Sequence, residues 1–177
     1  FTPEETEDAL FTLHYLGINN VLLLQGDSDK NTNRSAKPSA YKYASDLVYQ
    51  VSNMNKGIFL HEETETEMKT NFCIGVAAYP EKHFEAPNLN TDLKWLKHKV
   101  DCGSDYIVTQ MFFDNKKYFE FVEKCRAAGI TIPIIPGIKA LATKSQLSVL
   151  PKMFHIDIPE ELANGAENCK TDKAVKQ

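Results

Sequence analysis

The sequence lacks the patterns that mark several common classes of protein. None of its apolar runs approaches the ~18 residues of a membrane-spanning helix, and its first residues do not resemble a signal peptide. It has no G-x-G-x-x-G motif, no P-loop and no H-E-x-x-H motif. These absences argue against a membrane protein, a Rossmann-type dinucleotide site, a P-loop nucleoside triphosphatase and a zinc protease.

Cysteine is scarce, and the basic residues are not in excess. The four cysteines lie far apart and form no C-x-x-C pair. We therefore predict reduced thiols in the cytoplasm rather than a disulfide framework, and we expect no metal site. The formal net charge of −4 argues against nucleic acid or an anionic membrane as the main partner, because phosphate binding usually requires a basic patch.

The remaining composition is that of an ordinary globular chain. Of its 177 residues, 42% are hydrophobic and 25% are charged. We predict a single domain over residues 1–177. Within it, residues 55–71 are rich in glutamate and threonine, and we interpret them as a surface insertion.

Short apolar runs alternate with amphipathic segments along the chain. Strands buried on both faces are predicted at 20–25, 72–78, 106–112 and 132–138. Helices are predicted at 2–17, 39–54 and 91–102, and the first has Thr2 as its N-cap with Glu5 closing a capping box. Further helices are predicted with Asn115 as N-cap, from Thr143 or Lys144, and from Pro159. The alternation predicts an α/β fold with a parallel sheet, either an open doubly wound sheet or a (β/α)8 barrel. A complete barrel needs eight strands and roughly 250 residues, so the chain would hold about half of one.

Candidate site residues lie at the carboxyl ends of the predicted strands, where ligands bind in both architectures. They are Gly26-Asp27 after the first strand, Tyr79 to His83 after the second, Thr109-Gln110 at the end of the third and Pro136-Gly137 at the end of the fourth. Asp27 could equally serve a turn, and His83 could be a solvated loop histidine. Gln110 is the most informative of them, because an unpaired amide near the end of a buried strand costs ~1–3 kcal/mol.

Five segments of the chain, taken together, resemble one known family, methylenetetrahydrofolate reductase. They are LLQGD (23–27), GVAAYPEKH (75–83), DLKWLKHKVDCG (92–103), VTQMFFD (108–114) and IPIIPGI (132–138). Their order and spacing match along nearly the whole chain, and the resemblance is greatest to the bacterial, single-domain form.

The resemblance implies a (β/α)8 TIM barrel, of which this chain covers about four β/α units. FAD would lie across the carboxyl ends of the strands. The activity implied is the reduction of 5,10-methylenetetrahydrofolate to 5-methyltetrahydrofolate with NADH or NADPH, which serves one-carbon metabolism and methionine synthesis. We expect the complete protein to be a cytoplasmic flavoprotein oxidoreductase and a homo-oligomer, with neither nucleic acid nor a membrane as partner.

The resemblance also assigns roles to individual residues. Asp27 and Gln110 are the predicted catalytic residues, and together with Gln146 they are expected to contact the folate. Lys99 would reach an FAD phosphate, although its position on a helix otherwise favours a solvated face. The full set predicted to bind FAD is Gln25, Gly26, Asp27, Tyr43, Ala44, Tyr79, His83, Ala86, Asp92 and Lys99.

The sequence departs from the family pattern in several places. Gln25 stands where the family usually has arginine, and Leu150 stands where it has an aromatic residue that stacks on the substrate. The family's acid/base glutamate and a flavin-contacting histidine would precede Phe1, and a substrate arginine would follow Gln177. We therefore expect an internal piece of the barrel that is inactive on its own.

Two other functions stay open. One is a β/α-barrel lyase or aldolase acting on a phosphorylated small molecule, which would need a Schiff-base lysine inside a strand. None of the four predicted strands contains a lysine. The other is a barrel fragment without a catalytic role.

Overall fold

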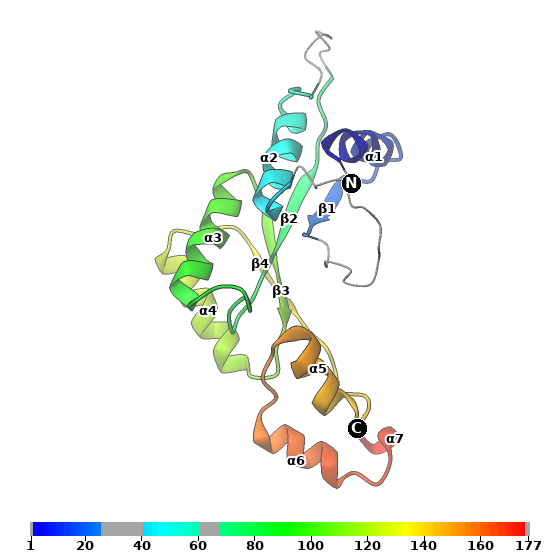
Figure 1. Ribbon diagram of the computed structural model, residues 1–177, viewed down its shortest axis with the longest axis vertical. Helices are drawn as coiled ribbons and strands as arrows, with labels where there is room; N and C mark the ends of the chain where they lie inside the picture. Colours follow the sequence, from blue (N-terminus) through cyan, green and yellow to red (C-terminus); the bar gives the residue numbers. More distant parts are fainter. Residues whose placement is uncertain (1, 26–40, 61–67, 176–177) are drawn as a thin grey trace. The chain divides into compact units, whose positions relative to one another are not determined.

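The computed structural model describes residues 2–25, 41–60 and 68–175 (Figure 1). Its strands are β1 (Asn20–Leu23), β2 (Cys73–Ala78), β3 (Tyr106–Met111) and β4 (Ile134–Gly137). Its helices are α1 (Pro3–Tyr15), α2 (Ala44–Asn55), α3 (Leu89–Asp101), α4 (Asn115–Ala127), α5 (Gln146–Phe154), α6 (Glu160–Asn168) and α7 (Asp172–Val175). Gly26 and Asp27 lie outside the described residues.

The four strands form one sheet in the order β1-β2-β3-β4. Strands β1 and β2 pair in parallel, with Val21 opposite Ile74 and Leu22 opposite Gly75. A doubly wound sheet reverses its strand order at a switch point, whereas a (β/α)8 barrel adds each strand beside the preceding one. The order here has no reversal. The α/β fold class is therefore confirmed, with four consecutive β/α units in the order found in the barrel.

The chain divides into two compact units. Unit 1 comprises Phe1–Ala77 and Leu96–Ile107, and unit 2 comprises Ala78–Trp95 and Val108–Gln177. No described helix in either unit is long and apolar enough to cross a membrane.

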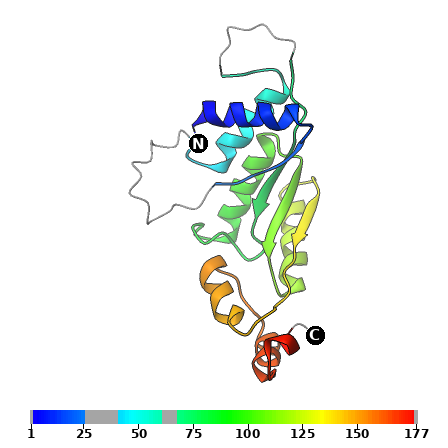
Figure 2. The ribbon, with the colours of Figure 1, turned by 90° about the vertical axis from the view of Figure 1, so that its right-hand side faces the viewer.

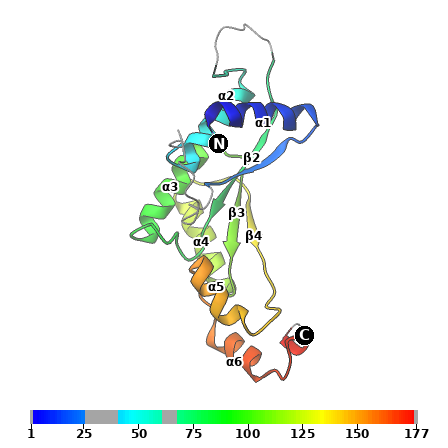
Figure 3. The same ribbon diagram turned by 45° about the vertical axis from the view of Figure 1, so that its right-hand side comes forward.

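Unit 1 begins with the predicted capped helix. The Thr2 hydroxyl oxygen accepts a hydrogen bond from the Glu5 N–H at 3.2 Å, and the Glu5 carboxylate accepts one from the Thr2 N–H at 2.9 Å. This reciprocal pair satisfies two donors that the helix itself leaves free. Helices α1 and α2 lie side by side (Figures 2 and 3), and the Gln50 side chain of α2 donates to the Pro3 carbonyl at 3.0 Å.

The core of unit 1 lies on one face of its strands. Fully or almost fully buried side chains of β1, α2 and β2 form it: Val21, Leu23, Val48, Val51, Met54, Ile74 and Val76. The opposite face of the first strand segment is not covered, because Leu22 is 43% exposed and Leu24 is 52% exposed. The prediction that the first strand is buried on both faces is therefore wrong. A continuous apolar run shows what a strand can bury, but it does not show that both of its faces are covered.

The segment interpreted as an insertion is fixed at both ends. The Asn55 side chain donates to the Phe72 carbonyl and accepts from the Phe72 N–H, each at 2.8 Å. The Thr70 hydroxyl donates to the same Asn55 oxygen at 2.8 Å, and Thr70 is buried. Residues 61–67 lie outside the described part of the chain, so the surface insertion stays a prediction.

Unit 2 contains α4 and the three C-terminal helices. Helix α4 begins after Asp114, whose carboxylate accepts from the Lys116 N–H at 2.8 Å, so the cap lies one residue before the predicted Asn115. Helix α6 begins after Pro159, as predicted. Leu141, Leu150 and Ile156 form a small apolar core at this end of unit 2, where α5, α6 and α7 come together (Figure 3).

Candidate functional site

The loop after β2 brings three predicted site residues together. The rings of Tyr79 and His83 meet edge to face, with their centroids 4.6 Å apart. The backbone N–H of His83 donates to the Asp92 carboxylate in the first turn of α3, at 2.8 Å. The exposed Phe84 ring stacks on His83 with the centroids 4.8 Å apart. Tyr79, His83 and Asp92 are all half-buried, so this cluster can contact a ligand.

The same loop contains a strained residue. Lys82 has a φ of 137°, a region that side-chain-bearing residues rarely occupy, and such strain costs ~1–3 kcal/mol. Its ammonium group donates to the His83 carbonyl at 3.0 Å and to the Ala86 carbonyl at 2.6 Å. The Ala86 N–H also donates to the His83 carbonyl at 3.0 Å. These bonds fix the backbone at His83 and Ala86, two of the predicted FAD-binding residues.

Glu81 lies within the candidate range Tyr79 to His83, but sequence reasoning assigned it no role of its own. Its carboxylate forms an ion pair with Lys117 of α4 and a hydrogen bond with the backbone of Asp157. Burial would lower the pKa of Lys117, but its hydrogen bonds to Asp157 and Glu81 outweigh burial and raise that pKa. The partners lie 36 and 76 residues from Glu81 along the chain, and no local pattern marks so distant a contact.

Lys99 lies in unit 1, on the last turns of α3. Its ammonium group donates to the carbonyl of Ala77, in β2, at 2.6 Å. The side chain is half-buried, so the simple alternative of a solvated helix face does not describe it. A cation held near the carboxyl end of a buried strand is suited to bind an anion, and the phosphate contact stays a prediction.

The other predicted FAD-binding residues of unit 1 lie in the sequence just before and just after residues 26–40, which are outside the described part of the chain. Gln25 is exposed and follows β1. Tyr43 is the N-cap residue of α2, and its N–H donates to the Asp46 carboxylate at 3.0 Å, while Ala44 is the first residue of the helix. Because Gly26 and Asp27 fall outside the described residues, their predicted roles stay untested.

Gln110 lies near the end of β3 and is half-buried. Its amide oxygen accepts from the backbone N–H of Met111 at 2.9 Å. Its NH2 group makes no hydrogen bond within the described part of the chain. A purely structural role therefore accounts for the oxygen of this side chain but leaves the two N–H donors for a ligand.

Gln146 and Leu150, both on α5, have clear local roles. The Gln146 amide oxygen accepts from the Ala142 N–H at 2.6 Å and the Thr143 N–H at 3.2 Å, so it closes the loop before the helix. Leu150 is 4% exposed and packs in the small apolar core of unit 2. In this structure Leu150 therefore cannot stack on a substrate as the family's aromatic residue would.

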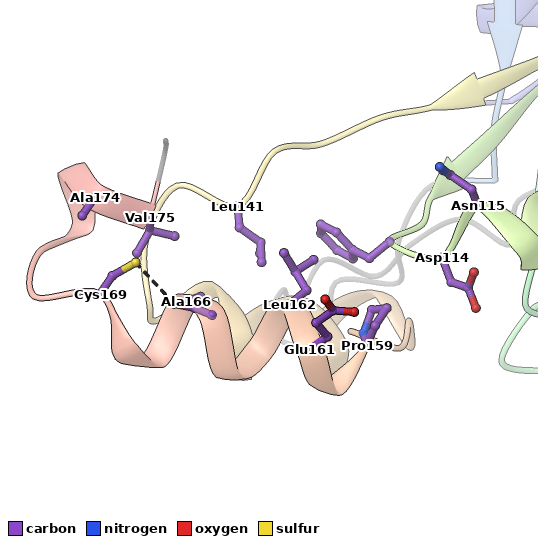
Figure 4. Close-up of a pocket in the computed structure, with 12 residues that line it drawn as sticks. Asp114, Asn115, Leu141, Pro159, Glu161, Leu162, Ala166, Cys169, Ala174 and Val175 are labelled. Atoms are coloured by element: carbon purple, nitrogen blue, oxygen red, sulfur yellow. Dashed lines mark hydrogen bonds between the residues drawn. The ribbon is translucent and has the colours of Figure 1, made fainter.

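A hollow of about 850 Å³ lies in unit 2, next to α6 and α7. Figure 4 shows the apolar side chains of Leu141, Leu162 and Val175 in it, with the Glu161 carboxylate near Pro159. None of the predicted site residues lines it. Across residues 2–25, 41–60 and 68–175, no group of three or more histidine, cysteine or acidic side chains could hold a metal ion.

Comparison with known proteins confirms the resemblance seen in the sequence. The sequence model of the family described as methylenetetrahydrofolate reductase matches residues 1–177. Methylenetetrahydrofolate reductase 1 of Schizosaccharomyces pombe is 37% identical over 171 residues, which are 97% of this chain and 26% of the relative. The 5,10-methylenetetrahydrofolate reductase of Escherichia coli is 33% identical over 176 residues, which are 99% of this chain and 53% of the relative.

Methylenetetrahydrofolate reductase (NADH) 1 of Arabidopsis thaliana is 35% identical over 184 residues, covering 98% of this chain and 29% of that protein. The chain thus spans about a quarter to about a half of the length of these relatives. The matches extend along the whole sequence and include each segment that carries the predicted site residues. The chain belongs to the methylenetetrahydrofolate reductase family.

Proposed function

We propose that this chain forms part of the catalytic barrel of an oxidoreductase that reduces 5,10-methylenetetrahydrofolate to 5-methyltetrahydrofolate with NADH or NADPH. Family membership over the full chain supports the reaction class. The observation that carries the proposal is the cluster of Tyr79, His83 and Asp92, which the β2 loop and the first turn of α3 bring together. A lyase that uses a Schiff base would need a lysine in a strand, and β1 to β4 contain none.

The residues of the β2 loop fit the proposed FAD. Tyr79 and His83 offer half-buried rings against which an adenosine or ribityl group can pack. The Asp92 carboxylate accepts the His83 N–H, so its charge is partly compensated beside a diphosphate. Ala86 presents only a methyl group to a ligand. When bound, FAD would supply hydride transfer between the nicotinamide and the folate.

The remaining proposed roles concern the substrate. Because Met111 fixes the Gln110 amide oxygen, the Gln110 NH2 group has a defined direction and can donate to folate or nicotinamide. Asp27 would oppose negative charge on the flavin ring and thereby adjust its reduction potential. Gln146 would contact the folate from the start of α5.

We extend the proposal to location and assembly. All four cysteines are free thiols, which is typical of the reducing cytoplasm. The complete protein would be a cytoplasmic homo-oligomer whose partners are small molecules, with no nucleic acid or membrane surface among them.

Replacing Gln110 tests the proposal in the complete polypeptide that contains these residues. Gln110→Glu removes the NH2 donors and keeps the size of the side chain and an oxygen facing Met111. We expect folate turnover to fall about 10- to 100-fold, since a misplaced contact in an active site commonly costs this much. Flavin content and the thermal midpoint should stay close to those of the wild type. A large fall in thermal midpoint with normal kinetics in the surviving protein would instead assign Gln110 to the core.

A further inference from the structure

Three segments that are remote in the sequence meet at the carboxylate of Glu81. Its Oε1 accepts from the Lys117 ammonium of α4 at 2.9 Å. Its Oε2 accepts from the backbone N–H of Asp157, between α5 and α6, at 2.8 Å. The Lys117 ammonium also lies 2.5 Å from the Asp157 carboxylate. We call these three residues the Glu81 network.

Burial makes Glu81 the centre of this network. Its side chain is 13% exposed, that of Lys117 is 33% exposed and that of Asp157 is 79% exposed. An ion pair shielded from water is much stronger than one on the surface, where solvent and salt screen it. The bonds made by Glu81 therefore hold the three segments together, and the Lys117–Asp157 pair contributes less.

The Glu81 network fixes the loop at the position directly before its strained residue, Lys82. Glu81 directly precedes Lys82, whose φ is 137°, and a strained backbone persists only where its surroundings fix it from both sides. The bonds from Lys82 to the His83 and Ala86 carbonyls fix the following side. The Glu81 network fixes the preceding side.

A second contact joins the same two segments. The Phe84 ring stacks on the His155 ring with centroids 4.9 Å apart and planes 22° apart. His155 has a φ of 53° and ends α5, two residues before Asp157. The connection between α5 and α6 therefore contacts the β2 loop at residues on both sides of His83.

We propose that Glu81 is a positioning residue for the cofactor loop, residues 79–86. Through Lys117 and Asp157 it keeps Tyr79 and His83 in the conformation that binds FAD, so α4 and the α5–α6 connection control the affinity of the loop. The FAD part of this statement rests on the proposed function. The part that concerns the order of the loop does not.

The first test measures the order of the loop in the complete polypeptide without cofactor. Glu81→Gln keeps the shape of the side chain and removes its charge. We expect the backbone amides of residues 83–86 to exchange hydrogen about tenfold faster, as expected for local opening, while exchange in α1 is unchanged. Lys116→Ala is the matched control, because it removes an exposed 3.8 Å ion pair with Glu120 on the same helix and should leave the loop unaffected. Unchanged exchange in Glu81→Gln would overturn the proposal.

The second test measures the dissociation constant of FAD. If only a tenth of the molecules keep the loop in its binding conformation, the apparent constant rises about tenfold. Lys117→Met should give a similar loss, and the double variant should be little worse than either single one, because both act through one network. Phe121→Leu, a substitution of a buried residue of α4, is the control for general destabilisation. A loss of FAD affinity in Phe121→Leu equal to that in Glu81→Gln, at equal loss of thermal midpoint, would overturn the positioning role.

The two tests separate this inference from the proposed function. If the wild type binds no FAD but Glu81→Gln loosens the loop, the flavin function is wrong and Glu81 still positions the loop. If the wild type binds FAD and Glu81→Gln changes neither exchange nor affinity, the function stands and the inference is wrong.

Discussion

Strand β2 buries Ile74, Val76 and Ala78 on one face, where their exposure is 1%, 0% and 4%, whereas Cys73 and Ala77 on its other face are half-buried. The neighbouring strands repeat this difference. The buried face comprises Val21, Leu23, Ile74, Val76, Ala78, Ile107 and Thr109. The open face comprises Leu22, Cys73, Gly75, Ala77, Tyr106, Val108 and Gln110, and of these residues Gly75 alone is buried.

The two faces differ because one is completed by the helices of the chain and the other is not. In a (β/α)8 barrel, helices cover the outer face of the strands, while side chains from the other strands fill the inner face. Four strands can therefore have their outer face covered by the helices of the same four β/α units. The inner face needs further strands, and Gln110, the most informative polar residue of the sequence, lies on it.

The largest expected difference is in the free energy of unfolding, when one side chain on the buried face and one on the open face are each shortened to alanine. In the 177-residue chain, Ile74→Ala should lower the free energy of unfolding by about 2–5 kcal/mol, because it leaves a cavity in a packed core. Leu22→Ala, at a side chain that is 43% exposed, should lower it by only about 0.5 kcal/mol. Urea unfolding measures both values. Equal losses at the two positions would show that the open face is as well packed as the buried one.

A smaller change in the free energy of unfolding is expected at Gly75, where the ring of Tyr106 covers part of the open face. A Cβ added at Gly75 would lie 2.3 Å from the ring of Tyr106, whose hydroxyl donates to the Val21 carbonyl at 3.2 Å. Gly75→Val should therefore lower the free energy of unfolding by about 1–3 kcal/mol through overpacking. In a Tyr106→Ala background the same substitution should cost clearly less. A cost that does not depend on residue 106 would mean that the ring does not cover this position.

The smallest effect concerns two thiols and leaves stability at neutral pH unchanged. Burial raises the pKa of Cys125, whose side chain is fully buried, to about 11. Burial and then the Asp105 carboxylate raise the pKa of Cys73 as well, but this thiol lies on the open face and is half-buried. Iodoacetamide at pH ~8, below the ordinary cysteine pKa, should label Cys73 slowly in the folded chain and Cys125 only after unfolding. Mass spectrometry reads both sites, and early labelling of Cys125 would contradict its burial.

The sign of the pH dependence follows from the raised pKa of Cys125. The folded state favours the protonated thiol, so this group stabilises the fold fully below the unfolded pKa of ~8.5. The contribution is lost as the pH rises toward about 11. Alkaline unfolding of the wild type should therefore begin at a lower pH than that of Cys125→Ala, once their neutral stabilities are matched.

The sequence predicted local features well. The Thr2–Glu5 cap and the Pro159 helix start depend on residues within one turn, and both are observed. The start of α5 was placed too early, because the Gln146 side chain itself closes the loop before the helix. The uncovered face of β1 could not be predicted, since the apolar run does not say which faces a partner will cover.

In the candidate site, too, the sequence predicted the contacts between residues close along the chain and not those between distant residues. The residues from Tyr79 to His83 were placed at one strand end by the apolar run that precedes them. The bond from His83 to Asp92 spans only nine residues and follows from the loop that joins β2 to α3. The contact of Glu81 with Asp157 spans 76 residues, and only tertiary structure brings those two together.

The ammonium group of Lys82 has a consequence for the chemistry of its loop. With the His83 and Ala86 carbonyl oxygens at 3.0 and 2.6 Å, it occupies the position that a bound metal cation holds in an oxygen-lined site. The loop thus has its own covalently attached cation, and chelators cannot remove it. Lysine acetylation would remove this charge and two of the three N–H donors of the group, so the His83 and Ala86 carbonyls would lose the cation that they share. A single acyl group could in this way act on the loop as demetallation acts on a calcium-binding loop.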